Sequence, residues 1–284
     1  MRVTLYGTRG SIPAPGPETM RYGGNTPAVH VCAENGAVLV LDAGTGIRRL
    51  GAQVPAATTR VDILLTHLHM DHIQGLGFFP PLYNPAVEVH LWGPASSTLS
   101  LEARLSRYLS PPLFPVHLRD LPSVSCHQVP RASFDIGPFR ILTALVSHPG
   151  PTVGYRIAAD GGVISYLSDH EPALCLRNGR WPGREWVSGF DLAADADLLI
   201  HDAQYTDEEY DSHVGWGHSS CRHALEFASY VGARKFIAFH HDPGHDDEML
   251  DRLHENAVRG IRPNFAVSGG CEGAVFDVSG GAAR

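Results

Sequence analysis

The sequence predicts an α/β (α+β) fold in which two β-sheets pack face to face with helices outside. Apolar segments typical of strands are clustered early in the chain and later alternate with segments of helical periodicity. The hydrophobic fraction of 43% and the charged fraction of 18% are ordinary for a globular protein. Because no repeat, low-complexity tract or linker interrupts the 284 residues, we expect one domain over residues 1–284.

Local patterns predict the individual elements. Alternating or apolar runs bounded by turn residues, with Asn35-Gly36 as a hairpin signal, predict strands at 3–7, 28–33, 37–42, 61–66, 87–92, 124–130, 139–147, 153–159, 162–167, 196–201, 235–239 and 273–278. The close spacing of the four strands between 124 and 167 is typical of an antiparallel sheet. Apolar periodicity predicts helices at 47–53, 73–79, 96–108, 219–231 and 246–259. The Gly- and Pro-containing segments 8–26, 109–122 and 170–190 are expected to be loops, with 109–122 a candidate lid.

Net charge and cysteine content argue against several classes of protein, namely non-specific nucleic-acid binders and disulfide-rich proteins. With 22 basic and 30 acidic residues the formal net charge is −8, which disfavours non-specific binding to nucleic acid. The five cysteines are widely spaced and odd in number, as expected for reduced thiols rather than a disulfide framework. The first residues run directly into a strand pattern, and no apolar run is as long as a membrane span. We therefore expect a soluble cytoplasmic protein that does not bind membranes.

The clearest functional pattern is a group of potential metal ligands directly after the predicted strand at 61–66. It comprises His67, His69, Asp71 and His72. Imidazole nitrogen and carboxylate oxygen suit zinc, manganese or iron better than calcium or magnesium. A turn can direct His67 and His69 to one ion, whereas the adjacent Asp71 and His72 more easily face a second. The alternative is a solvated His-rich loop, which the position after a buried strand disfavours.

Three further potential ligands follow predicted strands later in the chain. They are His148, Asp169 and His240. Each alone could be an ordinary polar loop residue. Together with the first group they indicate that ligands converge at one edge of a sheet. His241 competes with His240, which is preferred because it follows the strand directly.

These seven residues together resemble the ligand pattern of the metallo-β-lactamase superfamily, which implies a four-layer αββα sandwich with a dinuclear metal site at one edge. Within the superfamily the sequence is most similar to the ribonuclease Z and phosphodiesterase branch. The segment 199–205 resembles the "HEAT" motif of this branch, with Asp202 where Glu is usual, and Gly217-His218-Ser219-Ser220 resembles its "HST" motif.

The resemblance implies a role for each of these residues. One divalent ion would be bound by His67, His69 and His148, the other by Asp71, His72 and His240, with Asp169 bridging them. Zinc is the expected metal, and manganese or iron are alternatives. Two such ions generate a bridging hydroxide that attacks phosphorus. Asp71 would orient the attacking water, and His218, held by Asp202, would protonate the leaving alkoxide. The alternative for His218 is a structural contact at a helix start, with Ser219 as the N-cap.

A small phosphodiester such as a cyclic nucleotide is the expected substrate. Ribonuclease Z carries a basic tRNA-gripping arm between the positions that match His148 and Asp169, but here only 20 residues separate them. A tRNA 3′-processing endonuclease is therefore the less favoured alternative. Hydrolysis of a lactone, thioester or β-lactam, or a non-catalytic sensor, are further alternatives. The family also implies a possible homodimer.

Residues that contact the substrate are weakly indicated. Arg9 and Arg21, in the Gly-rich loop near the N-terminus, are candidates for a phosphate contact, although loop arginines are more often solvated. Trp181, Trp186 and Trp216 are candidates for stacking on a base, although packing within the protein is an equal alternative.

Overall fold

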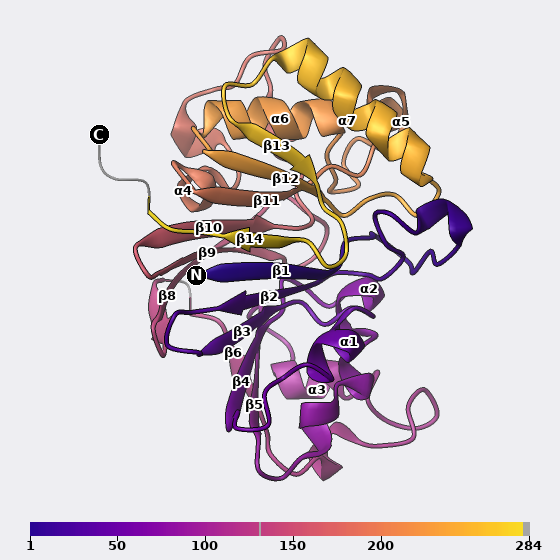
Figure 1. Ribbon diagram of the computed structural model, residues 1–284, viewed down its shortest axis with the longest axis vertical. Helices are drawn as coiled ribbons and strands as arrows, with labels where there is room; N and C mark the ends of the chain where they lie inside the picture. Colours follow the sequence, from indigo (N-terminus) through magenta and orange to yellow (C-terminus); the bar gives the residue numbers. More distant parts are fainter. Residues whose placement is uncertain (131, 281–284) are drawn as a thin grey trace.

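A computed structural model describes residues 1–130 and 132–280. Figure 1 shows two β-sheets in the middle of the molecule with helices on either side, so that four layers follow one another. The predicted α/β sandwich of two face-to-face sheets is confirmed.

The first sheet has seven strands. Their order is β14 (Val275–Asp277), β1 (Arg2–Gly7), β2 (Ala28–Cys32), β3 (Val38–Leu41), β4 (Arg60–Leu64), β5 (Glu88–Gly93) and β6 (Val124–Gln128). Strands β14 to β3 pair antiparallel, whereas β3 to β6 pair parallel. The carboxyl ends of the parallel strands therefore meet at one edge of the sheet.

The second sheet also has seven strands. Their order is β13 (Ala266–Gly269), β12 (Lys235–Phe239), β11 (Leu198–Asp202), β10 (Gly162–Leu167), β9 (Val153–Ala159), β8 (Phe139–Leu145) and β7 (Phe134–Ile136). Strands β13 to β10 pair parallel, and β10 to β7 pair antiparallel.

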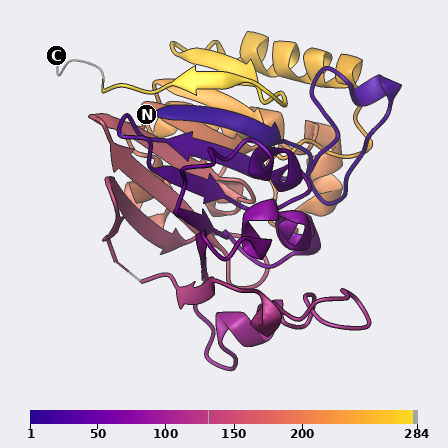
Figure 2. The ribbon, with the colours of Figure 1, turned by 60° about the horizontal axis from the view of Figure 1, so that its bottom comes forward.

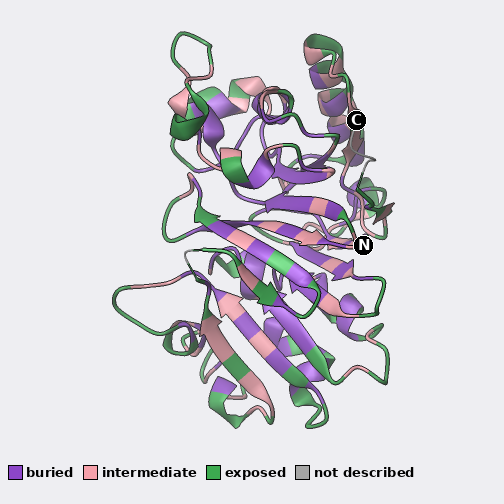
Figure 3. Cartoon of the chain, turned by 90° about the vertical axis from the view of Figure 1, so that its left-hand side faces the viewer, coloured by how far each residue is buried: buried purple, intermediate pink, exposed green. Residues whose placement is uncertain are grey.

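Three apolar clusters hold the layers together. The central one lies between the sheets and includes Leu5, Leu41, Tyr155 and Phe239, none of which has measurable exposure. A second packs the outer face of the first sheet, and a third the outer face of the second sheet, against helices. Figure 3 shows buried residues along the strands in the middle of the molecule and exposed ones mostly in the loops. Rigid sheets thus support the loops at their edges.

The helices are mostly short. They are α1 (Ile47–Gly51), α2 (Met70–Ile73), α3 (Leu101–Leu105), α4 (Phe190–Ala193), α5 (Asp207–His213), α6 (Cys221–Tyr230) and α7 (Asp247–Ile261). Within residues 1–130 and 132–280, no helix combines the length and the apolar character that crossing a membrane requires.

Several boundaries and pairings differ from the sequence predictions. The strand predicted at 124–130 is β6, which pairs parallel with β5 in the first sheet instead of joining the antiparallel strands β8 to β10. In place of the helix predicted at 96–108 the structure has the shorter α3, Leu101–Leu105. Its N-cap is Ser100 rather than Ser96. Strands β7 and β13 and helices α4 and α5 were not predicted. The segment 109–122 is a loop with one short turn of 3₁₀ helix at Leu118–Asp120, and Figure 2 shows it in magenta, extending away from the sheets.

Candidate metal centre

The predicted ligands come from four loops at one edge of the sandwich. His67 and His69 lie in the loop between β4 and α2, Asp71 and His72 lie in α2 directly after it, and His148 follows β8. Asp169 follows β10, and His240 follows β12. Because each loop begins at the carboxyl end of a strand, segments far apart in the sequence are brought to one place.

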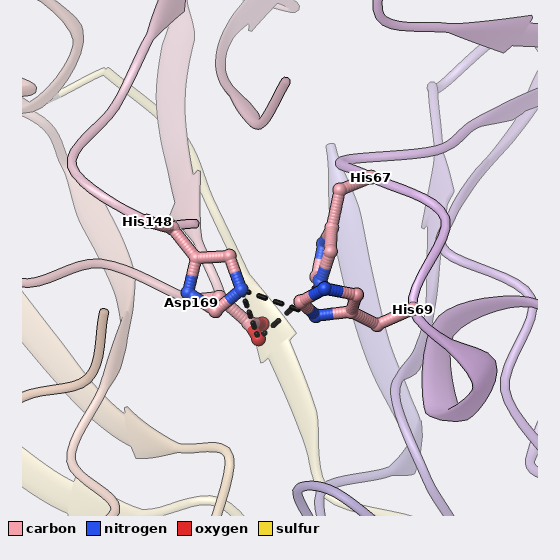
Figure 4. A group of neighbouring side chains, drawn as sticks. All are labelled: His67, His69, His148 and Asp169. Carbon is pink, nitrogen blue, oxygen red and sulfur yellow. Dashed lines mark hydrogen bonds and ion pairs between the residues drawn. The ribbon is translucent and has the colours of Figure 1, made fainter. Parts of the chain in front are cut away.

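Figure 4 shows a first group in which His67, His69, His148 and Asp169 point toward one another. Nε2 of His148 lies 3.2 Å from Nδ1 of His69. Oδ2 of Asp169 lies 3.6 Å from Nε2 of His67 and 3.8 Å from Nε2 of His148. The four potential ligand atoms all lie within 4.8 Å of one another, which is a suitable arrangement for one ion.

A second group adjoins the first. It contains Asp71, His72 and His240, whose Nε2 atoms lie 3.3 Å (His72) and 3.1 Å (His240) from Oδ2 of Asp71. Asp169 also reaches this group, since its Oδ1 lies 3.0 Å from Nε2 of His72. The carboxylate of Asp169 therefore lies between the two groups, as a bridging ligand would. His241 is not part of either group, because its Nε2 donates to the backbone oxygen of Gly270 at 2.9 Å.

The other ring nitrogen of several histidines is held by a neighbouring oxygen. These contacts are His67 with Oγ1 of Thr66 (3.1 Å), His72 with Oδ2 of Asp42 (2.9 Å), His148 with the carbonyl of Gly217 (2.9 Å) and His240 with Oε1 of Gln204 (2.9 Å). Such contacts fix the orientation of an imidazole, so that Nε2 is directed to a metal.

Asp42 and Gln204 are functional residues that the sequence reasoning missed. Asp42 is fully buried and also accepts hydrogen bonds from the backbone nitrogen of Thr66 (2.8 Å) and the hydroxyl of Tyr166 (2.9 Å). The signal for Asp42 was present, because it is a carboxylate at the end of the strand predicted at 37–42. Gln204 lies within the motif-like segment 199–205, but nothing in the sequence indicated that its amide would contact a ligand.

The directions in which the pKa values of the potential ligands are shifted suit a centre that binds cations. Burial lowers the pKa of His67 and of His148, which leaves both imidazoles neutral and able to donate a lone pair. Although burial alone would raise it, the pKa of Asp169 is held well below its ordinary value by His240 and His72. Burial opposes the charged form of His72 too, yet nearby carboxylates, Asp169 foremost, raise its pKa well above the usual range. The centre therefore favours positive charge.

Two buried atoms strengthen this conclusion. Among the residues that the structure describes, Nε2 of His67 and Nε2 of His72 are two of the buried side-chain atoms that make no well-formed hydrogen bond, and Nε2 of His72 has only the ion-pair contacts with Asp71 and Asp169. A buried polar atom without a partner is costly, and a bound divalent cation satisfies it. The residues present thus fit the metal ions that the sequence pattern implied.

His218 and Asp202 form a buried pair beside the second group. Nδ1 of His218 lies 2.6 Å from Oδ2 of Asp202, so the aspartate reaches the imidazole although it is shorter than the usual glutamate. Burial opposes protonation, but the charge of Asp202 raises the pKa of His218 to about 9. One ligand atom each of His218, Asp169 and His240 lie within 4.8 Å of one another. The cap of α6 is Ser220 and not Ser219, whose backbone nitrogen donates to Asp202 instead.

The prediction that Arg9 contacts substrate is wrong. Its side chain is fully buried, and it donates to the carbonyl oxygens of Gly23 (2.9 Å), Asp242 (2.9 Å) and His245 (2.6 Å), so it holds loops together. Arg21 is exposed, but its guanidinium pairs with Asp251 at 2.6 Å. The structure therefore gives Arg21 a carboxylate partner, Asp251, that belongs to neither group of potential ligands.

The three candidate tryptophans have different environments. Trp181 is partly buried and stacks on Tyr230 at a centroid distance of 5.6 Å, which is the packing alternative. Trp186 and Trp216 are exposed, at 74% and 61%.

Comparison with known proteins agrees with this geometry. The sequence profile of the family described as "Beta-lactamase superfamily domain" matches residues 38–241. A relative named ribonuclease Z, from Myxococcus xanthus, is 26% identical over 252 aligned residues, covering 74% of this chain and 80% of the relative.

Solved structures share the fold over nearly the whole chain. A structure described as a new diphosphatase from the PhnP family superposes with a TM-score of 0.69 at 17% identity, covering 97% of each chain. Zinc-bound PqqB from Methylobacterium extorquens superposes with a TM-score of 0.68 at 16% identity, covering 98% of this chain and 100% of that one. The chain belongs to the metallo-β-lactamase superfamily: it is a hydrolase of that fold, with relatives named ribonuclease Z.

Proposed function

We propose that the protein is a phosphodiesterase that hydrolyses a small phosphodiester, such as a cyclic nucleotide, with two divalent metal ions. The observation that carries the proposal is the His218–Asp202 pair, with its short 2.6 Å contact, beside the two groups of potential ligands. Hydrolysis of a phosphodiester expels an alkoxide, and an alkoxide needs a proton as it leaves.

The potential ligands would hold two metal ions. One ion would be held by His67, His69 and His148, the other by Asp71, His72 and His240, and Asp169 would contact both. When bound, the two ions supply an activated water and neutralise charge on the phosphoryl oxygens. Zinc suits this donor set, and so do manganese and iron.

Asp71 and His218 would handle the protons of the reaction. Oδ2 of Asp71 is fixed by the backbone nitrogen of Ser11 at 2.8 Å and can accept a hydrogen bond from the attacking water. As water adds to phosphorus, the bond from phosphorus to the leaving oxygen breaks. His218 then gives that oxygen its proton, while Asp202 stabilises the imidazole in its charged form before the transfer.

A small substrate is favoured over tRNA. The 20 residues between His148 and Asp169 are occupied by the hairpin of β9 and β10, which leaves no room there for an added arm. The net charge of −8 also opposes binding to a long polyphosphate backbone. The names of the relatives, a ribonuclease and a diphosphatase, are those of enzymes that cleave bonds to phosphorus, which supports a phosphate ester rather than a lactone, thioester or β-lactam.

A substrate panel tests the proposal. The protein loaded with zinc or manganese would be assayed with bis(p-nitrophenyl) phosphate, cyclic nucleotides, precursor tRNA, a lactone, a thioester and a chromogenic cephalosporin. We expect turnover of the small phosphodiesters and its loss in His69→Ala. Turnover of the lactone, thioester or cephalosporin alone would refute the phosphodiesterase assignment, and turnover of precursor tRNA alone would refute the small-substrate assignment.

A further inference from the structure

The segment that connects α5 to the candidate acid His218 has a tightly defined backbone. Gly215 and Gly217 have φ angles of +88° and +90°, in the region that favours glycine. A Cβ atom on Gly217 would lie 2.3 Å from Nδ1 of His148 and 2.4 Å from Cδ of Pro149. The carbonyl of Gly217 also accepts from His148 at 2.9 Å. The segment is thus fitted closely against the metal centre.

The buried carboxylate of Glu171 holds the backbone of this segment, residues 215–217, through hydrogen bonds. Glu171 has no measurable exposure, and it accepts hydrogen bonds from the backbone nitrogens of Gly215 (2.9 Å) and Gly217 (2.7 Å) and from the hydroxyl of Tyr210 (2.9 Å). Hydrogen bonds to a buried charged group are strong and costly to break. The backbone on both sides of Trp216 is therefore held in one conformation.

Trp216 stands between these two glycines and is 61% exposed. Its ring meets His213 edge to face at a centroid distance of 4.6 Å. His213 stacks on Tyr205 at 4.8 Å, and Tyr205 in turn meets the ring of His218 at 5.9 Å. A series of aromatic rings thus connects the indole with the candidate acid. Burying an exposed aromatic side chain is favourable, so an exposed tryptophan whose backbone is held on both sides, two residues before the candidate acid, is a suitable surface for a ligand.

We propose that Trp216 is the stacking surface for a planar ring on the leaving alcohol of the substrate, and hence that the substrates are nucleotide phosphodiesters. This inference rests on the proposed function. His218 would protonate the leaving oxygen, and Trp216 precedes it by two residues on the segment that Glu171 holds; on this ground we assign the ring that stacks on Trp216 to the leaving side. Stacking is tolerant of base identity because every base has a π-face. The site would accept more than one base.

The test compares two substrates that share the reacting group. Adenosine 2′,3′-cyclic phosphate carries a base, and methyl riboside 2′,3′-cyclic phosphate does not. In the metal-loaded protein, Trp216→Ala is expected to lower kcat/KM for the adenosine compound by about 5- to 150-fold, the range for loss of one base stack. The loss for the abasic compound should be a small part of that. Trp216→Phe keeps a ring and should restore most of the difference.

Trp186→Ala is the matched control, since Trp186 is also exposed, at 74%. It should leave the ratio of the two substrates unchanged. A second readout needs no turnover: adenosine monophosphate should quench the intrinsic fluorescence of the wild type and of Trp186→Ala, but much less that of Trp216→Ala.

The outcomes separate the inference from the proposed function. Equal losses with both substrates in Trp216→Ala, or no loss with either, would overturn the stacking role while phosphodiester turnover by the wild type upheld the enzyme assignment. Absence of turnover with every phosphodiester would overturn the proposed function, and the inference with it.

Discussion

Replacing His218 with alanine removes the group proposed to protonate the leaving oxygen. Nδ1 of this imidazole is held by Asp202 at 2.6 Å, so that Nε2 is the atom available to a substrate. A general acid contributes about 10²- to 10⁴-fold to the rate, or about 3–5 kcal/mol of transition-state stabilisation. We expect a loss of that size for a cyclic nucleotide, whose leaving alkoxide is a strong base.

The leaving group provides the assay. p-Nitrophenolate is a stable anion and needs little protonation, so His218→Ala should lower kcat for bis(p-nitrophenyl) phosphate by only about tenfold or less. The measurement is kcat for both substrates, wild type against variant, at saturating metal. The ratio of the two losses reports proton donation separately from a general disturbance of the site.

Two results would rule out His218 as the general acid. Equal losses with the two leaving groups would mean that His218 positions the substrate or the metals and does not donate a proton. A drop in bound metal per chain in His218→Ala would make it a ligand, an outcome that its closeness to Asp169 and His240 makes worth measuring.

Three further predictions concern the neighbours of the centre. Asp42→Asn removes the charge that holds Nδ1 of His72 and should weaken metal binding by about 10- to 100-fold, measured by competition with a chelating dye; unchanged affinity would contradict the orienting role. Asp202→Asn removes the charge that raises the pKa of His218 to about 9. The proton is present below that pKa and lost above it, so the alkaline limb of the rate profile for a cyclic nucleotide should move to lower pH, and an unmoved limb would count against the pairing. Gly217→Ala places a Cβ against His148 and should reduce turnover with an unchanged far-UV circular dichroism spectrum; a fully active variant would show that the segment is not rigid.

The potential ligands could be predicted because of where they stand in the chain. His240 directly follows β12, Asp169 lies two residues after β10, and parallel strands present their carboxyl ends at the same edge of a sheet. His67 and His148 could be placed for the same reason, since each lies three residues after the end of its strand, β4 or β8. The ends of strands can be predicted from a sequence, and each segment that carries a potential ligand follows the end of a strand.

Other features depend on contacts that no local pattern records. Strand β6 resembles its successors in composition, and only its pairing with β5 assigns it to the first sheet. Helix α5 begins with a capping box of Thr206 and Glu209, but its seven residues include only one apolar side chain, Tyr210, so no helical periodicity marked it. Strand β13 is only four residues long.

Burial explains the error at Arg9. An arginine in a Gly-rich loop is usually solvated, but here three backbone carbonyl oxygens surround its guanidinium. Two of those carbonyls, of Asp242 and His245, lie 233 and 236 residues from Arg9 in the chain, so no local pattern could reveal them. The buried Glu171, which holds the backbone on both sides of Trp216, was overlooked for a similar reason, since its partners Tyr210, Gly215 and Gly217 lie 39, 44 and 46 residues further along the chain.

The number of metal ions bound per chain shows whether the two groups of potential ligands form a two-ion centre. The two groups of ligand atoms, with Asp169 between them, require two ions. After loading with zinc or manganese and removal of the free metal, elemental analysis by mass spectrometry should give a ratio of about two per chain, as expected for a two-metal site. A ratio of one or less would contradict the account.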